Sequence, residues 1–201
     1  MLTAQNEHGL SRGISVKFYN EMFNKFLSNC KDGNSYKDSL KNSLSKIATR
    51  NRNETNEKDL ILTQFKKNKD IFLPIIADRH AIYIRLKEEN GKGTISIFNT
   101  GKDTSDAHTV QEGATNKIKS KITKQFIPES KKISDIIENI IDAEKSEILK
   151  EVYNVFNQIT GDIVENSNFH TQQKSGNCTL KSILECFRDE ISEEDFIQFR
   201  L

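Results

Sequence analysis

Residues 70 to 99 read DIFLPIIADRHAIYIRLKEENGKGTISIFN, and this stretch decides the fold of the chain. Three runs within it, at 70–76, 80–86 and 93–99, are rich in Ile, Phe and Tyr, which favour strands. The Asn-Gly pair between the last two runs is a strong signal for a hairpin turn. The segment therefore predicts three strands, and it predicts that 80–86 and 93–99 pair as a hairpin.

The segments on either side of this stretch differ from it in composition. Residues 117–127, KIKSKITKQFI, alternate Lys, Ser or Thr with Ile, which is the period of a half-buried strand, and Pro128 is expected to end that strand. Residues 49–59, TRNRNETNEKD, contain no apolar residue and predict a solvated loop. We therefore expect a fourth strand after the hairpin and a polar connection before it.

Helical spacing of apolar residues appears near both ends of the chain. It runs over 14–27, more weakly over 39–48, and along 133–160, where it predicts one long helix or two in series. Two shorter helices are predicted near the C-terminus, one beginning near Cys178 and one over 192–199. The whole pattern predicts an α+β fold in which helices flank a small central antiparallel sheet.

The length of 201 residues fits one domain. We expect residues 1–201 to form a single domain with an N-terminal helical part (1–50), a polar loop (51–59) and a core (60–201).

The composition excludes several classes of protein. Lys and Arg total 30 against 29 acidic residues, and no long basic block occurs, so a nucleic-acid partner is not expected. No apolar run approaches the roughly 20 residues of a membrane span, and the N-terminus lacks a signal-peptide layout, so we expect a soluble protein. Three cysteines without a CxxC pair fit a reducing compartment.

One of these cysteines has an unusual context. Residues 172–178, QQKSGNC, form a small polar run that ends in Cys178, which begins the apolar-periodic stretch after it. A helix N-terminus directs unpaired N–H groups and the positive end of its dipole at a thiol there, and so favours the thiolate. Cys178 is therefore a candidate nucleophile, whereas Cys30 and Cys186 are expected to be buried and inert.

A catalytic thiol needs a base, and the chain contains four histidines. His80 is the best placed, because it begins a predicted strand that would fix the imidazole at an edge of the sheet. His108 falls in a polar segment and is expected to be a solvated loop residue, with closing the site or binding substrate as the alternative. The remaining two are His8 and His170.

A histidine base needs an acceptor that orients its second ring nitrogen. Asn99 ends the strand predicted to pair with the His80 strand, so the two side chains are expected to be neighbours. Asp78, Asp103 and Asp106 remain possible substitutes.

Hydrolysis of an acyl bond also needs a donor for the oxyanion. Gln172 and Gln173, a few residues before Cys178, are both placed to supply one beside the backbone N–H of the cysteine. No His or Cys pair has the spacing of a zinc site, so neither metal nor cofactor is expected.

The order His80, Asn99, Gln172, Cys178 resembles that of the ubiquitin-like-protein proteases of clan CE, which include bacterial effector deubiquitinases and acetyltransferases. The segments HAIYI, ISIFNTG and QQKSGNCTLKS also resemble cysteine-protease-like domains in effectors of intracellular bacterial pathogens. Papain-like proteases of permuted order are an equal alternative. The spacing in clan CE favours Gln172 over Gln173 as the oxyanion donor.

The resemblance implies a cysteine-protease-like domain, with residues 60–201 as its catalytic core, and a thiol-dependent hydrolase that cleaves a peptide or isopeptide bond. Its partner would be a host protein, such as ubiquitin or a ubiquitin-like protein. The enzyme would act in the cytoplasm, or reach host cytoplasm by a route without a signal peptide. Alternatives are an effector acyltransferase with the same Cys and His, and a non-catalytic interaction module on a degenerate protease fold.

A rival site lies near the N-terminus. Residues 9–15, GLSRGIS, resemble the nucleophile segment of another group of papain-like effector proteases, with Ser11 where the cysteine would stand. In that case His80 and Asn99 would serve Ser11 in place of Cys178.

Overall fold

The computed structural model describes residues 21, 41–42, 44–48, 56–78, 80–100, 108–112, 115–164, 169–171, 178–190 and 193. The helices predicted over 14–27 and 192–199 therefore lie almost entirely outside the described residues. Residues 41–42 and 44–45 are helical, in agreement with the prediction for 39–48.

The centre of the fold is a five-stranded antiparallel sheet with the order β1-β2-β3-β6-β7. Its strands are β1 (Asp70–Ala77), β2 (His80–Glu89), β3 (Lys92–Phe98), β6 (Lys121–Phe126) and β7 (Asp162–Val164). The three predicted strands are confirmed as β1, β2 and β3. Asn90 and Gly91 join β2 to β3 with φ of 52° and 73°, so both residues occupy the left-handed region that a two-residue type I′ turn requires.

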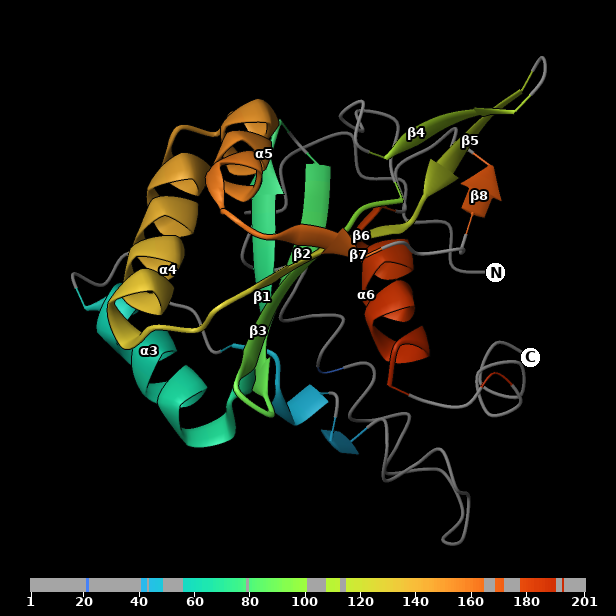
Figure 1. Cartoon of the computed structure of the whole chain (residues 1–201). Helices are drawn as coiled ribbons and strands as arrows, with labels where there is room; N and C mark the ends of the chain where they lie inside the picture. The colour runs from blue at the N-terminus through green and yellow to red at the C-terminus, as the bar shows by residue number, and fades with distance from the viewer. Residues whose placement is uncertain are drawn as a thin grey trace, which may run out of the picture.

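Both faces of this sheet are covered by helices. Figure 1 shows α3 (Glu57–Asn68), α4 (Ser130–Lys145) and α5 (Leu149–Gln158) on one side and α6 (Cys178–Arg188) on the other. The side chains of Ile82, Ile84 and Leu86 belong to the larger core beneath α3, α4 and α5. Because both faces are covered, β1 is buried along its whole length, and its residues after Asp70 form a continuous apolar run. The predicted α+β arrangement is confirmed.

The apolar stripe over 133–160 forms two helices in series, α4 and α5. They are separated by Ser146, Glu147 and Ile148, and Glu147 has a φ of 61°, which no helix interior allows. Helix α3 was not expected from the sequence. It takes in the last three residues of the loop predicted over 51–59, so that loop is shorter than predicted.

The single strand predicted over 117–127 is wrong, because the chain breaks at Ser120 into β5 (Thr115–Lys119) and β6. Strand β5 leaves the main sheet and pairs with β4 (Thr109–Glu112) and β8 (Phe169–Thr171) in a second, three-stranded sheet. The alternating pattern continues across the break because both halves are strands. As predicted, the second half ends before Pro128.

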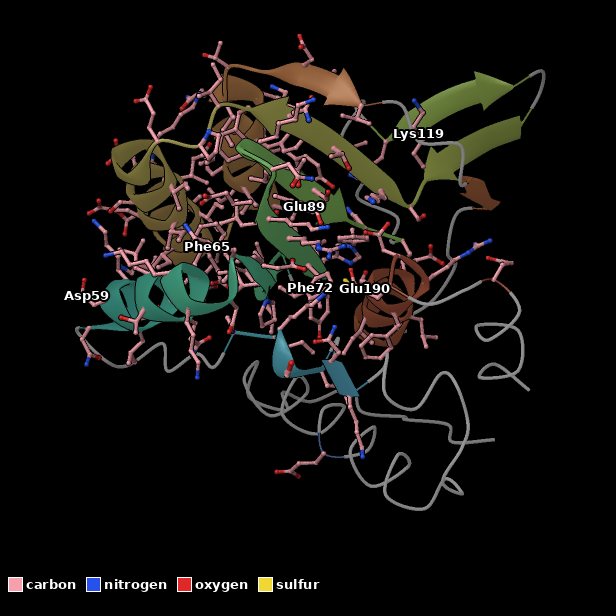
Figure 2. All side chains as sticks on the ribbon, turned by 60° about the horizontal axis from the view of Figure 1, so that its bottom comes forward. Asp59, Phe65, Phe72, Glu89, Lys119 and Glu190 are labelled. Carbon is pink, nitrogen blue, oxygen red and sulfur yellow. The ribbon has the colours of Figure 1, made fainter. Side chains whose placement is uncertain are left out.

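A cluster of charges on the α6 side of the sheet joins the N-terminal part of the chain, the strands of the sheet and the residues that follow α6. We call it the Arg85 cluster. It consists of Arg85, Asp70, Lys46, Lys121, Asp189 and Glu190. The guanidinium of Arg85 pairs with Asp70 at 2.6 Å and Asp189 at 2.7 Å, and it also contacts Glu190. Figure 2 shows Glu190 beside Phe72, over whose ring the guanidinium of Arg85 lies. The cluster holds the C-terminal end of α6 against the sheet.

Lys46 brings the N-terminal part of the chain to this cluster. Ile47 forms a parallel bridge with Phe72 of β1, and Ala48 donates its N–H to Phe72 O at 2.8 Å. Residues 46–48 therefore extend the β1 edge of the sheet.

In the described part of the chain, no helix has the length and apolar character that a membrane span would need.

Candidate active site

His80 and Asn99 are in contact at one end of the main sheet. His80 is the first residue of β2 and is 7% exposed, and its Nε2 lies 2.6 Å from Asn99 Oδ1. Tyr83 pairs with Phe98 in the ladder, so Asn99 is a diagonal neighbour of His80 on the same face. The predicted contact between the two side chains is confirmed.

Asn99 is held from three directions and is fully buried. Its backbone N–H donates to Ser120 O at 2.9 Å, and its Nδ2 donates to the hydroxyl of Tyr153 at 2.8 Å. Its Oδ1 accepts from His80, so Nε2 carries the proton when the imidazole is neutral. The lone pair of neutral His80 is therefore on Nδ1, the nitrogen that can act as a base.

Helix α5, which carries Tyr153, is fixed to the sheet at both ends by groups that suit its dipole. At its N-terminus the Leu149 N–H donates to Asp78 Oδ2 at 2.7 Å. At its C-terminus Lys124 Nζ donates to three carbonyls, at 2.9 to 3.1 Å, and burial lowers the pKa of this lysine. Asp78, one of the substitutes considered for Asn99, thus uses its carboxylate to cap α5.

Helix α6 approaches the same end of the sheet from the opposite face. Ser182 Oγ donates to Ala81 O at 3.3 Å and lies 3.5 Å from Thr100 Oγ1, next to His80 and Asn99 in the chain. Seven residues later, Asp189 contacts Arg85. The helix therefore runs in the same direction as β2 and begins at the His80 end of the strand.

Cys178 is the first residue of α6, as predicted. It precedes Ser182 by four residues, so its backbone stands one turn, about 6 Å, nearer the N-terminus on the same side of the helix. Since Ser182 is level with Ala81, the backbone of Cys178 stands at or just beyond the end of β2 where His80 lies.

Cys186 lies two turns further along α6 and is 1% exposed. Burial, followed by the charge of Asp189, raises the pKa of its thiol well above the usual value, so the neutral thiol persists at neutral pH. The expectation that Cys186 is buried is confirmed.

The expectation that His108 is a solvated loop histidine is wrong, because its side chain has no exposed surface. Nδ1–H donates to Lys119 O at 2.5 Å, and the ring packs edge-on against Tyr153 with 5.5 Å between the ring centres. Burial lowers the pKa of His108 to about 4, so the ring is neutral at pH 7. Among the described residues, its Nε2 has no hydrogen-bond partner.

Tyr153 is the site residue that the sequence reasoning missed. It lies in the apolar stripe of α5 and is 3% exposed, and burial raises the pKa of its hydroxyl. A tyrosine in a buried helix stripe needs a partner for its hydroxyl, and that need was the available signal. The partner is Asn99.

The other predicted site residues are not described in the same detail. For Cys178 and His170 the structure describes the backbone position. The remaining predicted candidates lie outside the described residues: His8, Ser11, Cys30, Asp103, Asp106, Gln172 and Gln173. Among the described residues, no group of three or more His, Cys, Asp or Glu is arranged to hold a metal ion.

Comparison with known proteins assigns no family. No protein-family model matches the chain, and no curated protein sequence matches it.

Proposed function

We propose that this protein is a cysteine-dependent hydrolase of peptide or isopeptide bonds, with Cys178 as nucleophile, His80 as base and Asn99 as the residue that orients the base. One observation carries the proposal. A buried histidine–asparagine pair occupies the end of the sheet at which α6 begins with a cysteine. Nucleophile, base and orienting acceptor are the three parts that thiol catalysis requires.

In the proposed reaction, Nδ1 of His80 takes the proton of the Cys178 thiol, and the thiolate attacks the substrate carbonyl. The backbone N–H of Cys178 and the amide of Gln172 stabilise the oxyanion. Imidazolium then protonates the leaving amine and the thioester forms. His80 next takes a proton from water, whose oxygen attacks the thioester. The imidazolium returns this proton to the leaving sulfur, which releases the acid and the free thiol.

The fold sets a spatial condition on this reaction. His80 and Asn99 face α5, whereas α6 covers the other face of the sheet. The thiol must therefore meet the imidazole at the end of the strands. Ser182 lies beside Ala81, so the first turn of α6 lies at that end of the strands. This position supports the proposed arrangement.

The resemblance to clan CE proteases supports ubiquitin or a ubiquitin-like protein of a host cell as the substrate. The test uses ubiquitin and ubiquitin-like probes that carry a C-terminal electrophile, with the adduct located by mass spectrometry. We expect one adduct, on Cys178, and none when His80 is replaced by glutamine. An adduct on Cys30, or no adduct with these probes or with electrophilic peptides, contradicts the proposal.

A further inference from the structure

The ring of His108 joins the second sheet to the body of the protein. Figure 1 shows β4, β5 and β8 projecting away from the main sheet and its helices. Immediately before β4, the His108 ring is fully buried and packs edge-on against Tyr153 of α5. His108 is also tied to β5, because Lys119 donates its N–H to His108 O at 2.8 Å. The residue therefore stands between the second sheet and α5.

The surroundings of this ring suit the neutral imidazole and not its cation. A backbone carbonyl can only accept, so the contact of 2.5 Å with Lys119 O places a proton on Nδ1. The lone pair of the neutral ring is then on Nε2, which has no hydrogen-bond partner among the described residues. Protonation of Nε2 would create a buried donor without an acceptor and a buried positive charge, and both are costly.

The groups that β5 and α5 present to the ring do not balance such a charge. Strand β5 contributes the ammonium of Lys119, which has the same sign as an imidazolium. Helix α5 contributes the hydroxyl of Tyr153, which stays neutral in acid because burial raises its pKa. Burial lowers the pKa of His108 to about 4, the hydrogen bond to Lys119 O opposes this shift, and the Lys119 ammonium adds to it.

We propose that His108 is an acid-sensitive anchor, whose protonation expels the ring from its place beside Tyr153 and detaches the second sheet from α5. Once the ring is in water, its cation is solvated and its pKa returns to the usual 6.5. The packed form is therefore fully stabilised above pH 6.5 and loses this stabilisation as the pH falls toward 4. Strands β2 and β3 should stay folded, because the main core is built without residues of the second sheet.

Hydrogen exchange of the full chain, resolved by segment with mass spectrometry, tests this proposal at pH 7 and pH 4.5. Protection factors are compared, because they divide out the pH dependence of the exchange chemistry itself. Between the two pH values we expect the protection of the β5 amides to fall about 30- to 100-fold. The protection of β2 and β3 should change by less than about threefold.

Two variants that cannot be protonated identify the responsible group. His108→Phe keeps a ring against Tyr153, and His108→Asn keeps a donor for Lys119 O. In both, the acid-dependent loss of β5 protection should be absent.

Two other histidines supply the controls, because they titrate in the same pH range. His80 is linked to Tyr153 through Asn99, and His170 pairs with Ile118 of β5. His80→Gln and His170→Gln should both retain the loss of β5 protection in acid.

Three exchange results would overturn the proposal: constant β5 protection in the unmodified protein, the same loss in both His108 variants, or its absence in His170→Gln. Nitrogen-15 NMR of the histidine rings keeps the test decisive if both His108 variants are unstable. A His108 ring that titrates near pH 6.5 while β5 stays protected also contradicts the proposal. These measurements need no activity, so they stand apart from the test of the proposed function.

Discussion

Cys178→Ala should remove both covalent labelling and hydrolysis, with activity falling roughly 10⁴-fold or more. The reason is that the proposed reaction has no other nucleophile, and Cys178 begins a helix at the His80 end of the sheet. The measurement is turnover of a ubiquitin-derived or peptide amide substrate, with the folded state of each variant checked by its thermal transition.

Cys186→Ala is the matched control, because this residue is in the same helix two turns later. Its thiol is buried and its pKa is raised, so the substitution should leave turnover within about threefold of the unmodified protein. Cys30→Ala should also leave it unchanged. An equal loss of activity in Cys186→Ala would remove Cys178 from its proposed role.

Arg85→Met should lower the free energy of unfolding by about 3–5 kcal/mol. Arg85 is 7% exposed, and its removal leaves the carboxylates of Asp70, Asp189 and Glu190 without their main partner. Burial by itself would lower the pKa of Arg85, but its hydrogen bonds to Asp70 and the surrounding carboxylates raise it. The arginine is therefore charged at every accessible pH. Urea unfolding followed by circular dichroism measures the loss.

Lys87→Met is the control for this variant, since Lys87 is two residues later on the same strand and the same face. Lys87 Nζ and Glu89 Oε2 are 2.9 Å apart in an ion pair that is exposed to solvent. The free energy of unfolding should therefore fall by less than about 1 kcal/mol in Lys87→Met. A loss in Arg85→Met no larger than in Lys87→Met would show that the Arg85 cluster does not stabilise the fold.

The pH dependence gives a second check on the Arg85 cluster. Burial alone would raise the pKa of Asp70, but hydrogen bonds and charges from Arg85 and Lys46 lower it overall. A carboxyl group whose pKa is lower in the folded state stabilises that state at pH values above its pKa in the unfolded chain. This stabilisation is lost as the pH falls through its pKa in the folded state. The stability difference between the unmodified protein and Arg85→Met should therefore narrow in acid.

Local sequence signals were sufficient for the hairpin and for the contact between His80 and Asn99. The Asn-Gly turn sets the register of β2 and β3, and the register brings the start of one strand to the end of the other. The beginning of α6 at Cys178 was likewise visible where a polar run gives way to helical periodicity.

The features that sequence reasoning missed depend on contacts between distant segments. The strand over 117–127 divides because Ser120 is buried between Asn99 and Glu185, which no local pattern reveals. His108 is in a polar segment but is buried against Tyr153. The short strands β4, β7 and β8, of three or four residues, are too brief for a period to appear.

Helix α3 was missed for a different reason. Its only buried apolar residues are Ile61 and Phe65, so the stripe that faces the core is narrow. Leu60 is exposed and lysines occupy the last turn, so the pattern around that stripe is irregular. The helix exists because these two side chains complete the core beneath β1, a tertiary effect.

The central claim is that His80 activates Cys178, and the pH dependence of Cys178 alkylation tests it most directly. The rate of modification by iodoacetamide would be followed residue by residue with mass spectrometry, in the unmodified protein and in His80→Gln. The claim predicts a midpoint for Cys178 below the value of about 8.5 for a free thiol, and a higher midpoint in His80→Gln. A midpoint at or above about 8.5 in the unmodified protein, unchanged by the substitution, would contradict it.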